Sequence, residues 1–162
     1  MCIPVKAKSY VTGLVEFCIF EPVASTLSVE SASNLFSTKM KLILAIGAGS
    51  FIGGICRYLL TQFIQARFLS TFPFGTLGVN IIGCLVIGLI YGLSDKGSLT
   101  QDWRLFLATG VCGGFTTFSA FSNETFLMLR NGQYAYAFIY VAASVVLGLL
   151  ATFGGYSIIK LF

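Results

Sequence analysis

Histidine is absent from this chain of 162 residues, and charged side chains make up only 10% of it. Soluble domains carry roughly a quarter or more of their surface residues as charged side chains. Hydrophobic residues account for 56% of the sequence, and the mean hydropathy is +0.89. This composition excludes an ordinary soluble domain and predicts an integral membrane protein in a lipid bilayer.

The same scarcity of polar side chains argues against a catalytic site. After Met40 the acidic residues are Asp95, Asp102 and Glu124, and no histidine is available as a general base. An enzyme would need a nucleophile with a base, paired carboxylates or a set of metal ligands. We therefore expect the protein not to be an enzyme.

Cysteine and net charge exclude two further classes. The five cysteines are odd in number and mostly lie in apolar runs, so we interpret them as packing residues rather than a disulfide or zinc framework. The net charge of +4 is scattered along the chain. It offers no clustered basic surface, so no nucleic-acid partner is expected.

Four long apolar runs follow Met40, and a spanning helix needs about 20 mostly apolar residues. The polar connections between the runs are too short to hold a soluble domain. The sequence therefore predicts an all-α membrane protein that acts within the bilayer or at its two faces. The predicted spans are Leu42–Ile64, Phe74–Leu93, Trp103–Leu129 and Tyr134–Leu161.

Residues 1–39 differ from the rest of the chain. Glu16, Glu21 and Pro22 interrupt the apolar run there, so no window is long enough to span a bilayer, and "SVESASNLFSTK" is typical of a linker. The layout of a signal peptide is missing. The segment is either an interfacial or disordered extension or sequence upstream of a true start at Met40. We favour the second and expect residues 1–39 to carry no function, with the working domain at 40–162.

Positive charge is divided almost evenly between the two ends of the predicted spans, four residues against three. An excess of Lys and Arg normally marks the cytoplasmic side. Either the topology is simply left undetermined, or the chain inserts both ways up and pairs antiparallel with itself. One side holds Lys41, Lys96, Arg104 and Lys160, and the other Arg67, Arg130 and Arg57.

Glycines four positions apart predict close helix contacts. Gly49 and Gly53 form such a pair in the first span, and Gly88 and Gly92 form another in the second. Small residues let helix backbones approach closely in lipid. These motifs are weakly specific, and we favour contacts within one subunit over contacts between subunits.

The third span contains an unusual stretch, "GVCGGFTTFSAFSNE", from Gly110 to Glu124. The pair Gly113–Gly114 followed by Thr116–Thr117 could break the helix, and freed carbonyls could then hold a cation. A continuous helix with hydroxyls bonded back to earlier carbonyls is an equal alternative.

Phe115, Phe118 and Phe121 recur every three residues and are predicted to share a helix face. Packing is the commoner explanation of such a stripe. A ring also has a positive edge, which could contact an anion if polar donors lie nearby.

Two pairs of uncharged donors lie four residues apart, Thr76 with Asn80 and Tyr140 with Ser144. Amide and hydroxyl groups can replace the water shell of a small anion. Hydrogen bonding between helices is the alternative, and it is the better interpretation for Thr76 and Ser144.

Two charged residues lie in or near the spans, Arg57 in the first and Glu124 in the third. Charges in lipid are costly, so each is predicted to face a partner or water, and the pair could flank an aqueous vestibule.

These motifs together resemble one family. "GSFIGGICRY" (49–58), "PFGTLGVNIIGCLVIG" (73–88) and "GVCGGFTTFSAFSNE" are similar, in order and spacing, to the Fluc family of bacterial fluoride channels, also called CrcB. The resemblance covers Met40 to Phe162.

The resemblance implies passive fluoride export across the bacterial inner membrane by an antiparallel, dual-topology homodimer with two pores. It also implies a structural sodium ion at the dimer centre, held by the backbone carbonyls of Gly113 and Thr116. The implied pore residues are Asn80 as essential amide donor, Thr76 beside it, Phe118 and Phe121 as ring edges, Tyr140 and Ser144 as a polar track, and Arg57 as a vestibule cation.

The chain departs from the family pattern at Gly148, where some members have a hydroxyl, and at Ala120, where the family has threonine. The contribution of Gly148 to the track is therefore in doubt, whereas the change at Ala120 is expected to be mild. A small four-helix multidrug transporter is the alternative function, but it needs an intramembrane carboxylate in its first span, and residues 42–56 contain none. Composition alone does not exclude a purely structural membrane protein.

Overall fold

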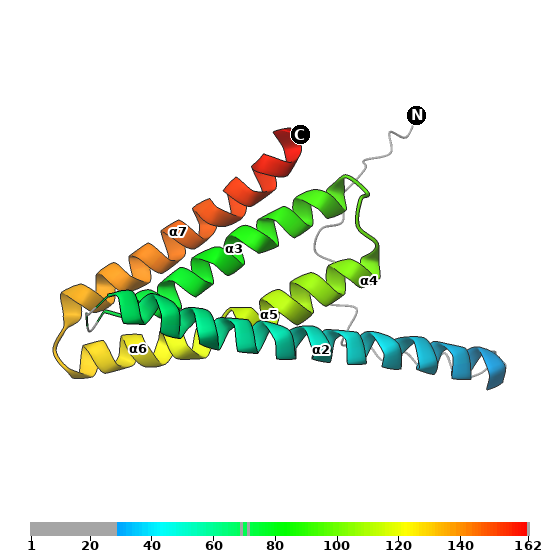
Figure 1. Cartoon of the computed structure of the whole chain (residues 1–162), viewed down its shortest axis with the longest axis horizontal. Helices are drawn as coiled ribbons and strands as arrows, with labels where there is room; N and C mark the ends of the chain where they lie inside the picture. Colours follow the sequence, from blue (N-terminus) through cyan, green and yellow to red (C-terminus); the bar gives the residue numbers. More distant parts are fainter. Residues whose placement is uncertain (1–28, 69, 71, 162) are drawn as a thin grey trace, which may run out of the picture. The chain divides into compact units, whose positions relative to one another are not determined.

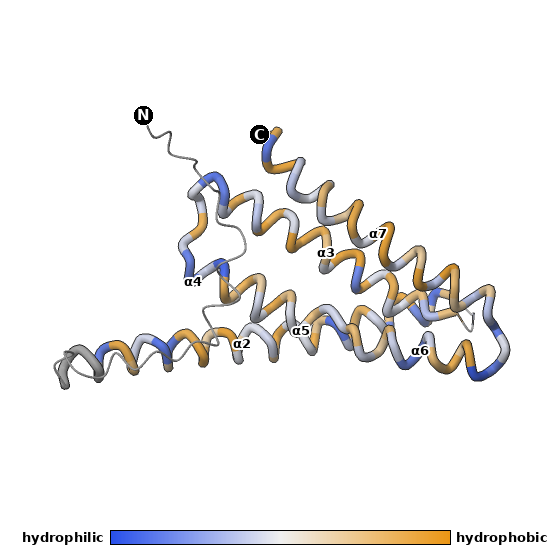
Figure 2. The backbone as a smooth tube through the Cα atoms, turned by 180° about the vertical axis from the view of Figure 1, so that it is seen from behind, coloured by the Kyte–Doolittle hydropathy of each residue, from blue (hydrophilic) through white to orange (hydrophobic). Residues whose placement is uncertain are grey.

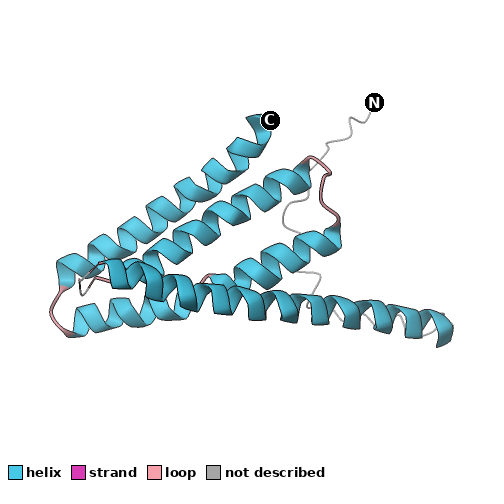
Figure 3. Ribbon diagram, viewed as in Figure 1, coloured by secondary structure: helices cyan, strands magenta, loops and turns pink. Residues whose placement is uncertain are grey.

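Every regular element in residues 29–68, 70 and 72–161, the part that the computed structural model describes, is a helix (Figures 1 and 3). Within these described residues, four stretches are long and apolar enough to cross a membrane, which confirms the four predicted spans. The third span is divided into several helical segments. The elements are α2 (Val29–Arg67), α3 (Phe74–Asp95), α4 (Gln101–Arg104), the π-helix η1 (Leu105–Cys112), α5 (Gly113–Phe115), α6 (Phe118–Arg130) and α7 (Tyr134–Leu161).

The first helix begins earlier than predicted. Residues 29–39 belong to α2, so the prediction of a linker there is wrong. No proline or glycine lies between Val23 and Ile46, and adding a residue to an existing helix costs far less than starting one. The helix therefore continues beyond its apolar part. The predictions for residues 1–28 lie outside the described residues.

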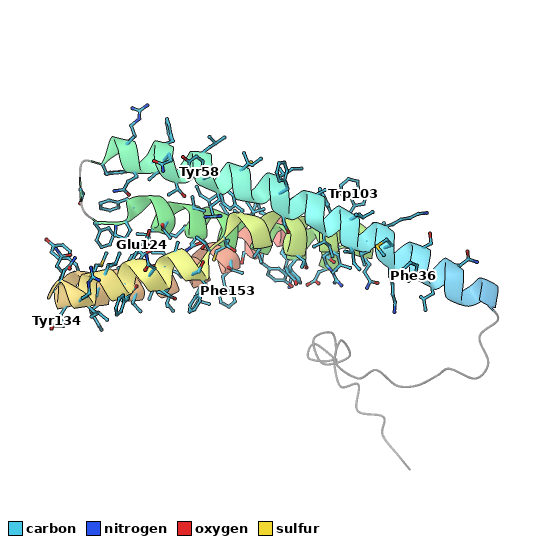
Figure 4. All side chains as sticks on the ribbon, turned by 90° about the horizontal axis from the view of Figure 1, so that it is seen from below. Phe36, Tyr58, Trp103, Glu124, Tyr134 and Phe153 are labelled. Atoms are coloured by element: carbon cyan, nitrogen blue, oxygen red, sulfur yellow. The ribbon has the colours of Figure 1, made fainter. Side chains whose placement is uncertain are left out.

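The four predicted spans all lie in one compact unit, Thr38–Phe162. Hydrophobic colour predominates along these helices in Figure 2, and hydrophilic colour gathers at the connections. Large apolar side chains such as Phe51, Leu150 and Phe153 remain well exposed in the single chain. Tyr58, Trp103 and Phe153 project outward from their helices in Figure 4. Helices that are apolar all round are expected to face lipid or another protein.

Helices α3 and α7 lie side by side over most of their length (Figure 1). A Cβ atom at Gly88 would overlap the carbonyl oxygen of Thr152, and one at Gly92 would lie 2.8 Å from the Cβ of Ile159. The residue numbers of the contacting pairs increase together along the two helices, so α3 and α7 run in the same direction.

Helix α2 packs closely against η1 through its own pair of glycines. A Cβ atom at Gly49 would lie 3.0 Å from the carbonyl oxygen of Phe106, and one at Gly53 would overlap the carbonyl oxygen of Val111. The contacts of both glycine pairs therefore lie within the subunit, as the sequence favoured.

Adjacent glycines in α2 provide a matched test of this packing. Gly53→Ala is expected to destabilise the protein by about 1–3 kcal/mol, because a backbone carbonyl blocks the new methyl group and cannot rotate away. Gly54→Ala should be close to neutral, since no atom of the described residues outside the α2 backbone lies within 4 Å of its Cβ position. Thermal unfolding of the detergent-solubilised proteins would measure both. Equal midpoints for the two variants would contradict the packing described.

Candidate functional site

The third span is broken at Thr116 and Thr117. Helix α5 ends at Phe115 and α6 begins at Phe118, with a short loop between them (Figure 3). Both threonines have extended backbones, with φ and ψ of −83° and 156° at Thr116 and −146° and 115° at Thr117. The predicted break is therefore present, and the alternative of a continuous helix is wrong.

Side chains at the break complete the ends of both half-helices. The hydroxyl of Thr116 donates to the carbonyl oxygen of Cys112 at 3.0 Å. The hydroxyl oxygen of Thr117 accepts the amide N–H of Ala120 at 3.3 Å and so caps the N-terminus of α6. Polar backbone at membrane depth persists only with such partners.

Asn80 of α3 holds the extended backbone from the other side. Its Nδ2 donates to the carbonyl oxygen of Thr117 at 3.2 Å, and its Oδ1 accepts the amide N–H of Thr117 at 2.9 Å. This pair of bonds fixes the orientation of the amide group. One hydrogen on Nδ2 is used in this way, and the second remains to donate elsewhere.

Both carbonyls predicted as cation ligands lose their ordinary helical partners at the break. In a continuous helix Gly113 would accept from the N–H of Thr117, and Thr116 would accept from the N–H of Ala120. These two N–H groups instead donate to Asn80 and to the Thr117 hydroxyl. Partial negative charge thus collects where α5 ends, an arrangement that suits a cation.

Arg57 lies beside this break and is half-buried. Its Nε donates to the carbonyl oxygen of Gly114 at 3.3 Å, and Ser50 of the same helix donates to the carbonyl oxygen of Gly110 at 3.3 Å. Arg57 therefore faces a backbone partner, one of the two settings predicted for it.

Glu124 of α6 points toward α3 (Figure 4), and its carboxylate accepts two hydroxyl hydrogen bonds. Thr76 donates to Oε1 at 2.6 Å, and Tyr140 donates to Oε2 at 2.7 Å. Thr76 is 4% exposed and Tyr140 is fully buried. The three residues, called the carboxylate cluster here, come from three different helices and explain how Glu124 is tolerated in the span.

The phenylalanine stripe is interrupted by the break. Phe118 and Phe121 share a face of α6, with ring centroids 5.8 Å apart, but Phe115 ends the preceding helix. The prediction that all three share one helix face is therefore wrong for Phe115. The Phe121 ring also contacts the Tyr140 ring, with centroids 5.2 Å apart. Phe118, by contrast, is 79% exposed in the single chain.

A cavity of about 310 Å³ lies beside the break. All of the side chains that line it are uncharged. It brings together Asn80, Phe118, Phe121 and Ser144 of the predicted pore, with Thr116 of the predicted cation site. The remaining lining residues are Cys84, Ile87, Thr117 and Val145.

The other predicted site residues lie outside that lining. Thr76 and Tyr140 are in the carboxylate cluster, where the Tyr140 ring contacts Phe121, while Arg57 lies on α2 and Gly113 is the first residue of α5. The Ser144 hydroxyl oxygen is buried and has no hydrogen-bond partner among residues 29–68, 70 and 72–161. Ser144 is also one of the residues that line the cavity.

Sequence reasoning missed the cap that Thr117 forms and the two partners of Glu124. A lone carboxylate in an apolar span signals that partners exist, but nothing in the spacing identifies residues 48 and 16 positions away. The π-helix before the break was missed as well.

Four apolar spans, a broken third span and an uncharged, mostly apolar open cavity beside the break define a multi-pass helical membrane protein with a solute-sized site. The segment 44–156 matches the family described as CrcB-like protein, camphor resistance (CrcB), and this chain belongs to that family. The predicted resemblance is confirmed.

Several curated relatives carry the name fluoride-specific ion channel FluC. The protein from Flavobacterium psychrophilum is 46% identical over 122 residues, covering 75% of this chain and 98% of that protein. The one from Phocaeicola vulgatus is 47% identical over 116 residues, covering 72% and 96%. The one from Leptospira interrogans is 44% identical over 123 residues, covering 75% and 97%.

Proposed function

We propose that this protein conducts fluoride passively across the bacterial inner membrane and thereby relieves fluoride toxicity. The observation that carries the proposal is the uncharged cavity where Asn80, Ser144 and the Phe118 and Phe121 rings meet beside the helix break. The names of the relatives support fluoride as the ion. The multidrug-transporter alternative is not favoured, because the first span lacks the carboxylate that it needs.

Fluoride must exchange its water shell for donors that hold it weakly enough to let it leave. Asn80 has one free amide hydrogen, and Ser144 has a buried hydroxyl with no other partner in the described part of the chain. The N-terminal end of α6, at Phe118, adds the positive end of a helix dipole without adding a fixed charge. These groups attract an anion but do not trap it.

The two phenylalanines of α6 complete this environment. Rings carry positive edges, so Phe118 and Phe121 can turn an edge toward an anion while keeping the wall dry. In this proposal Phe121 also connects the cavity to Tyr140, with ring centroids 5.2 Å apart.

The carboxylate cluster extends the path past Phe121. Thr76 and Tyr140 direct their hydroxyl hydrogens at Glu124, so the negative charge is held away from the cavity lining. Arg57 uses one N–H on the Gly114 carbonyl. Its other guanidinium donors are proposed to attract anions toward the break.

The working unit is proposed to be an antiparallel, dual-topology homodimer with two pores. The near-even division of Lys and Arg supports insertion in both orientations. Phe118 is proposed to line a pore although it is 79% exposed in one chain, so a second copy would complete the wall around it.

A structural sodium ion is proposed at the centre of that dimer. The carbonyls of Gly113 and Thr116 fit a cation, because their helical N–H partners are diverted to Asn80 and to Thr117. Gly113 is exposed on the single chain, which leaves room for a second copy to supply the same groups. The bound ion would supply positive charge that holds the two broken helices together.

Purified protein in liposomes tests the proposal directly. Fluoride efflux, read with an ion-selective electrode, is expected to far exceed chloride efflux, and chloride efflux without fluoride efflux would overturn the function. Replacing sodium by a bulky organic cation should lower the flux if the sodium site is correct. A tag at the C-terminus should be reachable from both sides of the membrane, and strictly one-sided labelling would refute dual topology.

A further inference from the structure

Helices α3 and α7 bring polar groups together at intervals of four residues. Thr76 and Tyr140 meet at Glu124, and Asn80 and Ser144 line the same cavity wall. Because the two helices run in the same direction, the next positions along them, Cys84 and Gly148, also face each other.

Cys84 and Gly148, the third of these pairs, lie in close contact. Among the described residues outside the α7 backbone, a Cβ atom built on Gly148 would have only the Cys84 sulfur within 4 Å, at 3.4 Å. Gly148 is buried and has no side chain, so the Cys84 thiol can occupy the space beside it. Cys84 is half-buried and lines the cavity with Asn80 and Ile87, which share its helix face.

At the next pair of positions, Gly88 on α3 and Thr152 on α7, this succession of polar groups ends. A Cβ atom at Gly88 would overlap the Thr152 carbonyl, so the backbones meet without a gap, and the Thr152 hydroxyl is turned back onto the Gly148 carbonyl at 3.1 Å. The last polar group on the α3 wall of the cavity is therefore the Cys84 thiol.

From this geometry we infer that Cys84 is a pore-lining residue whose S–H group donates to fluoride one helical turn beyond Asn80, in the space that Gly148 leaves open. This inference rests on the proposed function of the cavity. A neutral thiol is a weak donor. Weak donation at the end of the polar series suits release, since an ion that binds too tightly does not move on.

Substitutions at Cys84 test the inference through fluoride flux in liposomes. Cys84→Ala is expected to lower the flux about twofold to fivefold, the lower part of the range for one lost neutral hydrogen bond, because the thiol is a weak donor. Cys84→Ser keeps the size and a donor, so it should conduct faster than Cys84→Ala. The double variant Cys84→Ala with Gly148→Ser returns a donor from the opposite helix and should regain most of the lost flux.

Thiol labelling gives a readout that does not depend on flux. N-ethylmaleimide adds to the thiol, and mass spectrometry of the peptides follows each cysteine in the detergent-solubilised full chain. Fluoride should slow the labelling of Cys84 relative to chloride at equal ionic strength. Cys56 is exposed on α2 and does not line the cavity, so its labelling rate should be the same in both salts.

The outcomes separate the two proposals. Wild-type liposomes that release no fluoride would overturn the proposed function. Normal fluoride release with Cys84→Ala as fast as wild type, or with Cys84 labelling unaffected by fluoride, would overturn the assignment of Cys84 alone. A double variant no faster than Cys84→Ala would contradict the placement of the thiol opposite Gly148.

Discussion

Asn80→Asp is expected to abolish fluoride flux while leaving the protein in the membrane. The aspartate can still accept the N–H of Thr117, but it cannot donate to the Thr117 carbonyl or to an anion. A carboxylate about 4 Å from fluoride would also repel it by roughly 4 kcal/mol at an effective dielectric constant near 20. That penalty corresponds to a loss of flux of about a thousandfold.

The matched control changes another asparagine in the same way. Asn131 lies exposed in the turn between α6 and α7, outside the cavity lining, so Asn131→Asp should conduct like the wild type. Size-exclusion elution and circular dichroism of both variants would separate a conduction defect from a folding defect. Normal flux through Asn80→Asp would mean that the amide of Asn80 serves only to hold the break.

Hydropathy predicted the spans well because lipid imposes one simple requirement on each of them. The fourth predicted span, Tyr134–Leu161, coincides with α7, and the second differs from α3 only at its C-terminal end. The first lies within α2 but is shorter, because α2 already begins at Val29. Hydropathy limits the apolar part of a helix, but it does not indicate where a polar continuation stops.

The broken helix illustrates what local chemistry can and cannot predict. The glycines and threonines of the third span indicated a break, yet they left a continuous helix equally acceptable. The interaction that favours the break comes from Asn80, 37 positions away. Its side chain accepts the N–H of Thr117, which in a continuous helix would donate to the Gly113 carbonyl. The same limit applies to Glu124, whose two hydroxyl partners lie on α3 and α7. Contacts of this kind depend on how helices pack, which spacing in one sequence does not determine.

The arrangement at the break also relates the two proposed ions to each other. Carbonyls collect where α5 ends, and α6 begins after two intervening residues with its positive end toward the cavity. A single interruption thus creates a site suited to a cation and an adjacent one suited to an anion. Asn80 stabilises both, because its two hydrogen bonds to Thr117 set the backbone between them.

The role of the rings distinguishes conduction from packing, and two conservative substitutions test it. Phe118→Ile and Phe121→Ile keep an apolar side chain but remove the positive ring edge. Loss of an edge contact worth about 0.5–1.5 kcal/mol to the passing anion corresponds to a flux about twofold to tenfold lower. Fluoride efflux from liposomes would measure the change in each variant.

The loss of stability should differ between the two substitutions and so separate packing from conduction. Phe118 is 79% exposed in the single chain and packs little there, so Phe118→Ile should change stability little. Phe121 contacts the Tyr140 ring, so Phe121→Ile should lower the free energy of unfolding by about 1–3 kcal/mol. Phe126→Ile is the matched control, because Phe126 lies on the same helix, is 58% exposed and does not line the cavity. Its flux should equal that of the wild type. If Phe118→Ile conducts as well as Phe126→Ile, the edge of Phe118 does not contact the anion and the ring serves only to pack against its surroundings.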